Sequence, residues 1–156
     1  MPVLERLTKL FKAHPAPLPP KPLPEADVPH ALGALLVRIA LSDNHYAVQE
    51  ISQIDRILSR FQGIGPIDAA KLRAECERLE AFAPDTPDFA YLLCESVPYD
   101  TRLEMVSALW EVVFADGALQ QAEDDMMVLT QDHLGIRTED CDAAREAAKL
   151  ANSLSS

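Results

Sequence analysis

The chain has 156 residues, 48% of them apolar, and a formal net charge of −11 at pH 7. This length suits one domain with a tail, and the apolar content suffices for a packed core. The acidic balance argues against a nucleic-acid-binding surface, because phosphate contacts need clustered lysine and arginine, and it favours cations or basic partners. We therefore expect no nucleic acid among the partners.

The cysteines and the apolar runs indicate a cytoplasmic protein. Cys76, Cys94 and Cys141 lie far apart and form no CxxC pair, so we expect reduced thiols rather than a zinc or redox site. No apolar run is long enough to span a bilayer, and the N-terminus lacks the features of a signal peptide.

The first residues predict a short basic amphipathic helix over 1–13. One face is apolar and basic side chains lie beside it: Val3, Leu4, Leu7, Leu10 and Phe11, with Arg6, Lys9 and Lys12. Residues 14–26 hold six prolines and predict an extended, semi-rigid linker.

Charge favours one partner for this helix over another. Residues 1–24 carry a net charge of +3 and the remainder −14, so we expect the helix to dock on the helical body or on a second copy of the chain. Self-association or an unknown protein partner follows from this. Contact of the N-terminal helix with an anionic membrane is the less favoured alternative, because three basic residues give marginal affinity.

The remaining chain reads as helix throughout, and no convincing alternating strand pattern occurs. Asp27 and Pro29 open the first body helix, and Gly63 and Pro66 break the second. Asp100 or Thr101 is expected to cap the fifth helix, with Glu104 at the capping-box spacing after Thr101, and Thr138 to cap the last. The spacing predicts helices over 28–41, 48–61, 67–82, 88–96, 101–115, 121–133 and from 138 onward. We expect an all-α bundle of about seven helices over 27–152, followed by a tail at 153–156.

A short pattern occurs twice, 73 residues apart. The first copy reads LVRIALSDN over residues 36–44 and is followed by Glu50, and the second reads LWEVVFADG over 109–117 and is followed by Glu123. Each copy is an apolar helix that ends in aspartate, then a turn, then a glutamate that opens the next helix. The repeat predicts an internal duplication with pseudo-twofold halves.

Four carboxylates belong to these turns: Asp43, Glu50, Asp116 and Glu123. If the two halves bring them together, they would suit a hard divalent cation such as calcium, magnesium or manganese. The alternative is structural, since aspartate before Gly or Asn forms a turn and glutamate in a first helical turn caps amides and stabilises the helix dipole. The turns lack the ligand spacing of an EF-hand loop.

The phrase ALWEVVFADGAL at 108–119, followed by Glu123 and Asp124, resembles the TerB family of tellurite-resistance-associated proteins. The resemblance covers most of residues 26–137. It implies an all-helical fold with pseudo-twofold halves, related to the central helical domain of the co-chaperone DjlA, a link to tellurite and other chemical stress, and a suspected metal site. No enzymatic activity is established by this resemblance. The first turn departs from the family at Asn44, where glycine is usual.

We therefore expect a non-enzymatic, stress-associated TerB-like protein that binds a divalent cation through the paired Asp/Glu turns, with no other cofactor and no catalytic residues. The alternative is a metal-free helical adaptor for protein–protein interaction. An enzyme that uses the four carboxylates is a distant third reading, because no residue pair has a local signature of nucleophilic chemistry.

Overall fold

A computed structural model describes residues 23–42, 46–82, 86–115 and 121–155. Within these ranges the chain forms seven α-helices and no strand. The helices are α2 (Val28–Leu41), α3 (Val48–Gln62), α4 (Pro66–Phe82), α5 (Thr86–Ser96), α6 (Tyr99–Val113), α7 (Gln121–His133) and α8 (Thr138–Ser155). The predicted all-α bundle is confirmed. The predicted N-terminal helix and residues 14–22 of the predicted linker lie outside the described residues.

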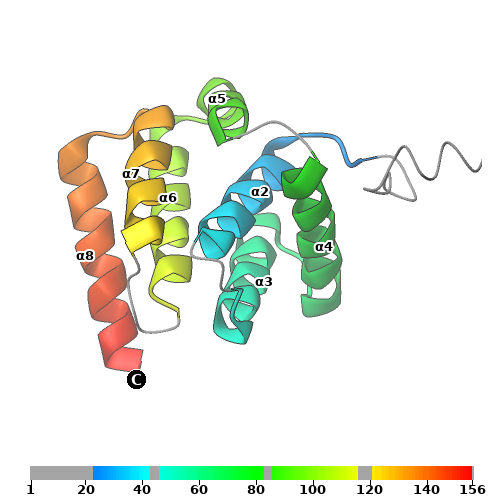
Figure 1. Ribbon diagram of the computed structural model, residues 1–156, viewed down its shortest axis with the longest axis horizontal. Helices are drawn as coiled ribbons and strands as arrows, with labels where there is room; N and C mark the ends of the chain where they lie inside the picture. Colours follow the sequence, from blue (N-terminus) through cyan, green and yellow to red (C-terminus); the bar gives the residue numbers. More distant parts are fainter. Residues whose placement is uncertain (1–22, 43–45, 83–85, 116–120, 156) are drawn as a thin grey trace, which may run out of the picture.

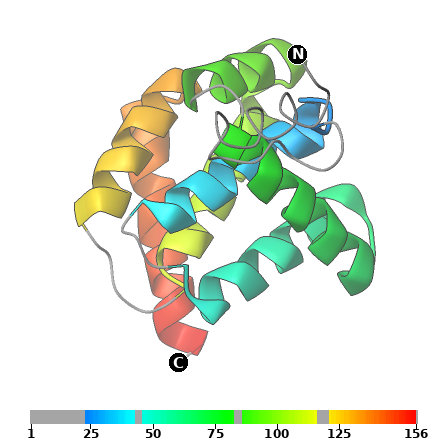
Figure 2. The ribbon, with the colours of Figure 1, turned by 45° about the vertical axis from the view of Figure 1, so that its right-hand side comes forward.

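Helix α2 forms the centre of the bundle. Nine of its fourteen residues are buried, because its sequence is apolar on nearly every face. It packs on α3, α4 and α5 and also on α6 and α7. Figure 1 shows α2 in the middle, with α4 toward one edge of the molecule and α8, which packs on α6, at the opposite edge. In the turned view of Figure 2, α7 lies at that edge instead.

The start of α2 is the one that the sequence predicts. Asp27 is the N-cap, and its carboxylate accepts a hydrogen bond from the backbone N–H of His30 at 3.0 Å. Helix α3 ends as expected at Gly63, which has a φ of +63° and forms the left-handed C-cap.

Several helix starts differ from those that the sequence predicts, and α5 begins at Thr86, two residues before the expected start. Helix α6 begins at Tyr99 with Pro98 as its N-cap, so the predicted cap at Asp100 or Thr101 and its capping box with Glu104 are wrong. Proline lacks an N–H and has a fixed φ, which suits it to a helix start. Helix α8 includes Thr138 as its first residue, although Thr138 was expected to be its N-cap. The helix continues through Ser155 and so includes residues 153–155 of the predicted tail.

The core is continuous from α2 to α8 and includes Trp110, Leu109 and Met127. Two helices approach very closely where α2 carries Gly33. A Cβ added at Gly33 would lie 2.1 Å from the Sγ of Cys76 on α4, so only glycine fits this contact. None of the described helices is both long and apolar enough to cross a membrane.

Candidate functional site

Glu50 of the first predicted half-site is fully buried. It is the third residue of α3 and is 0% exposed. Its Oε1 accepts a hydrogen bond from the backbone N–H of Ala47 at 3.0 Å. Ala47 is the N-cap and has no side-chain acceptor. Of the two hydrogen bonds of a capping box, the one that a side chain can form here is therefore the one that Glu50 accepts. The structural role expected for this glutamate is therefore present.

Glu123 of the second half-site occupies the same position in its helix. It is the third residue of α7 and is also 0% exposed. Glutamate is among the residues that proteins almost never bury fully unless the carboxylate is paired. Two buried glutamates at equivalent helix positions agree with the predicted duplication of the helix–turn–helix unit.

The other two predicted ligands, Asp43 and Asp116, lie outside the described residues. Among the residues that are described, no group of three or more histidine, cysteine, aspartate or glutamate side chains is arranged to hold a metal ion. The described part of the chain therefore supplies two of the four predicted ligands, and the four-carboxylate site stays a prediction.

A charged network lies just beyond the first turn. The Tyr46 hydroxyl donates to Glu77 at 2.6 Å, and Arg73 donates to Asp55 at 2.6 Å and to Glu77 at 3.0 Å. Burial and the hydrogen bond to Glu77 raise the pKa of Tyr46 above its usual range. This network joins α3 to α4 and holds the chain that leaves the first turn. Sequence reasoning missed it, because the contacts to α4 from Tyr46 and Asp55 join residues 31 and 18 apart, and only Arg73 and Glu77 lie one helical turn apart.

Trp110 of the second motif is a core residue, as its apolar position predicts. It is 2% exposed, and its indole Nε1 donates to Oε1 of Gln131 at 2.8 Å. Its ring stacks on Phe114 with centroids 5.7 Å apart, and the guanidinium of Arg145 lies 5.5 Å from its centroid. The motif thus fastens α6 to α7 and α8.

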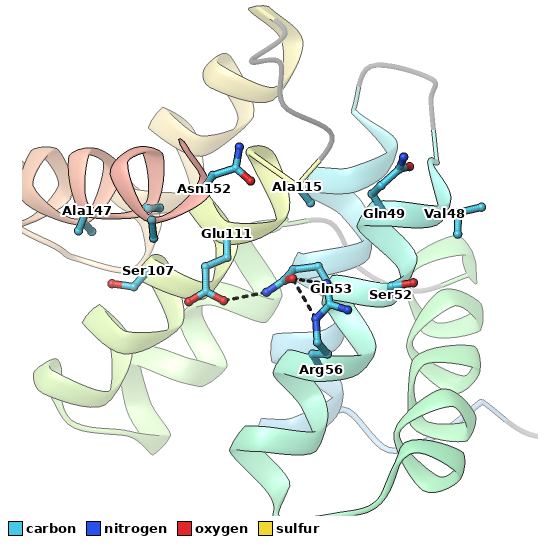
Figure 3. A pocket seen from close by; sticks show the side chains of 13 residues that line it. Val48, Gln49, Ser52, Gln53, Arg56, Ser107, Glu111, Ala115, Ala147 and Asn152 are labelled. Carbon is cyan, nitrogen blue, oxygen red and sulfur yellow. Dashed lines mark hydrogen bonds between the residues drawn. The ribbon is translucent and has the colours of Figure 1, made fainter. Parts of the chain in front are cut away.

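A groove of about 780 Å³ opens between α3, α6 and α8 (Figure 3). Its α8 wall is formed by alanines and its floor by α6, where Glu111 accepts a hydrogen bond from Gln53 of α3 at 3.0 Å. Sequence reasoning did not single it out. The signal was present, because the α8 alanines recur at helical spacing: Ala144, Ala147, Ala148 and Ala151.

The seven described helices, with an apolar helix buried at the centre, define an all-α helical-bundle protein. The family model described as tellurite resistance protein TerB matches residues 30–146. This range covers most of the chain, and the chain belongs to the TerB family. Comparison with curated proteins found no match, and neither did comparison with solved structures. The resemblance that the sequence showed to TerB proteins is confirmed, while the relation to DjlA stays a prediction.

Proposed function

We propose that this chain is a non-enzymatic, cytoplasmic TerB-family protein of chemical-stress resistance that binds a divalent cation at its paired turns. The observation that carries this proposal is the complete burial of Glu50 and Glu123 at the third position of α3 and α7. The same side chain is withdrawn from water at the same place in each half.

The donor chemistry fits a hard cation. A carboxylate removed from water is costly unless hydrogen bonds or a positive charge compensate it. Carboxylate oxygens are the ligands that calcium, magnesium and manganese prefer. Asp43 and Asp116 each precede a buried glutamate by seven residues and would complete an all-oxygen ligand set. A bound cation would neutralise these carboxylates and join the two halves of the bundle.

Thermal unfolding in the presence of calcium, magnesium, manganese or a chelator tests the proposal. An ion that binds only the folded chain stabilises it by mass action, by about 2.7 kcal/mol at a hundredfold excess over Kd. We expect at least one ion to raise the Tm of the native chain. The shift should shrink in the double variant Asp116→Asn/Glu123→Gln.

The matched control is Asp125→Asn/Asp132→Asn. Both of these aspartates are exposed on α7, and their replacement removes two negative charges, as the double variant at the turns does. This control should keep the full ion-dependent shift. An absent shift with every ion, or an equal shift in the Asp116→Asn/Glu123→Gln variant, would contradict cation binding at the turns.

A metal-free adaptor is the second candidate, and the outer face of α7 favours it. Val128 and Leu129 are 59% and 45% exposed, and Asp125 and Asp132 are exposed on the same helix. Such a surface suits a partner with apolar side chains flanked by basic ones. The two candidates separate in the ion titration, because an adaptor of this kind gains no stability from divalent ions.

A further inference from the structure

The groove between α3, α6 and α8 has the form of a seat for one more helix. Helices α3 and α8 both pack on α6, so α6 forms the floor and the other two form the walls (Figure 3). Most of the side chains that line it are small, including Ser52 of α3, Ser107 of α6 and the alanines of α8. Small side chains let two helices approach closely, since the distance between their axes depends on the residues at the contact.

The α8 wall presents uncovered apolar surface to this groove. Ala147 and Ala151 are exposed, and Leu154, which follows them on the same side of the helix, is 78% exposed. On the opposite wall Val48 of α3 is 74% exposed. Ala147, Ala151 and Val48 line the groove from its two walls, where an incoming apolar face would cover them.

The charge of the surrounding body favours a basic occupant, because residues 25–156 together carry a net charge of −14. The groove lining itself is balanced: it holds Arg56 of α3 and Glu111 of α6, and the guanidinium of Arg60 lies 3.4 Å from Glu111. A helix with an apolar face and basic flanks would match the apolar wall and the acidic body.

The chain itself contains such a segment, which lies outside the described residues. Residues 3–11 place Leu7, Leu10 and Phe11 on one predicted face, and Arg6, Lys9 and Lys12 flank it. Its charge is opposite to that of the body.

The length of the linker, and the place where it joins the body, indicate whether the segment docks in the groove of its own chain or in that of a second copy. The described chain begins beside α4, whereas α8 forms the opposite edge of the molecule (Figure 1). Residues 13–22 span about 30 Å if extended as proline-rich chain. A body of this size is about 35 Å across, and a route over its surface is longer still. The linker is therefore short for the chain's own groove but can reach that of a neighbour.

We propose that residues 3–12 of one chain dock in the α3/α6/α8 groove of a second copy of this chain. Leu7, Leu10 and Phe11 would contact the alanines of α8, and a basic flank would approach Glu111. The docking is independent of cation binding at the turns. Reciprocal exchange of the two segments gives a closed dimer with twofold symmetry.

Light scattering on the full-length chain tests this docking. We expect a mass of about twice 17.2 kDa. The segment variant Leu7→Asp/Phe11→Asp and the groove variant Ala147→Arg/Ala151→Arg should each be monomeric. Both groove alanines are exposed within a helix, so arginine there leaves the fold intact and fills the groove with bulk and positive charge. The control Ala74→Arg, at an exposed alanine of α4, should stay dimeric.

Mixing the two monomeric variants gives the decisive result. The groove variant still has an intact segment and the segment variant still has an intact groove, so a one-way heterodimer should form. A monomeric native chain, or a dimer that survives both double variants, would overturn the proposal. So would a mixture that stays monomeric, or full-length chain that co-sediments with anionic vesicles only while its segment is intact and is a monomer in their absence.

Discussion

At the start of α2, the imidazole of His30 lies between two carboxylates. Its Nδ1 is 2.6 Å from Asp27 and its Nε2 is 2.6 Å from Glu75 of α4. A neutral imidazole has one N–H, so only the charged ring can donate to both acceptors. Burial lowers the pKa of His30, but the hydrogen bonds to Glu75 and Asp27 outweigh burial and the net pKa is raised.

This arrangement predicts a stability that falls as pH rises. Because the folded pKa of His30 exceeds the unfolded value of about 6.5, its contribution is complete below that value and is lost as pH rises through the raised folded pKa. The free energy of unfolding of the native chain minus that of His30→Gln should be larger at about pH 6 than at about pH 9.

Urea titration at a series of pH values measures that difference. Subtracting the variant removes the contribution of the other histidines, which both proteins share. A difference that is constant with pH, or that grows as pH rises, would show that His30 is not a cation when it contacts Asp27 and Glu75.

For the two described glutamates of the candidate site, the sequence could predict their position in the helix but not their burial. Periodicity placed Glu50 and Glu123 in first helical turns, and the structure agrees. Their complete burial was not predictable, because a polar residue at a helix start is ordinarily solvated. Burial here depends on neighbouring helices, which local spacing does not report.

Helix existence could be predicted from the sequence far better than helix ends. Asp27 and Gly63 mark ends correctly, because each acts through a local interaction, a side-chain cap at one and a left-handed backbone at the other. The start of α6 was wrong because the capping-box pattern of Thr101 and Glu104 competed with Pro98, and the proline position prevailed. The capping-box pattern and the proline are both local signals, and the sequence pattern alone does not show which of them determines where the helix begins.

Two neighbouring glycines give a test at the level of one helix end. Gly63 has a φ of +63° and Gly65 does not lie in the left-handed region, while an added Cβ at either would meet nothing within 4 Å. Gly63→Ala should therefore lower the free energy of unfolding by about 1 kcal/mol through backbone strain alone. Gly65→Ala should leave it unchanged or raise it slightly, because alanine restricts the unfolded chain.

Chemical denaturation of both variants measures the two values side by side. Equal losses would mean that an unfavourable contact at the α3–α4 turn, rather than backbone conformation, determines the cost at both positions.

The packing of the whole molecule depends on contacts that no local pattern encodes. An apolar 28–41 segment predicts a buried helix, but not that α2 packs on five others. The close approach at Gly33 and Cys76 and the groove along α8 have the same origin, since both depend on how distant helices cross. Sequence reasoning therefore gave the elements and the fold class, while the surfaces that could bind a partner emerged only from their assembly.

The central position of α2 predicts that the bundle unfolds as one unit. Leu36 is 0% exposed and belongs to a helix that contacts both α3–α5 and α6–α7. Leu36→Ala should cost about 2–5 kcal/mol of stability. Because the loss is shared, helix content and the environment of Trp110, the single tryptophan, should change at the same denaturant concentration.

Circular dichroism and tryptophan fluorescence, recorded in one denaturant series, measure the two transitions. The control Ile67→Ala removes an aliphatic side chain that is 72% exposed on α4 and should change stability by less than about 0.5 kcal/mol. If Leu36→Ala moved the helix signal but left the Trp110 transition at its native midpoint, α6 and its neighbours would fold without α2. The core would then be two cores, one for each copy of the repeated unit.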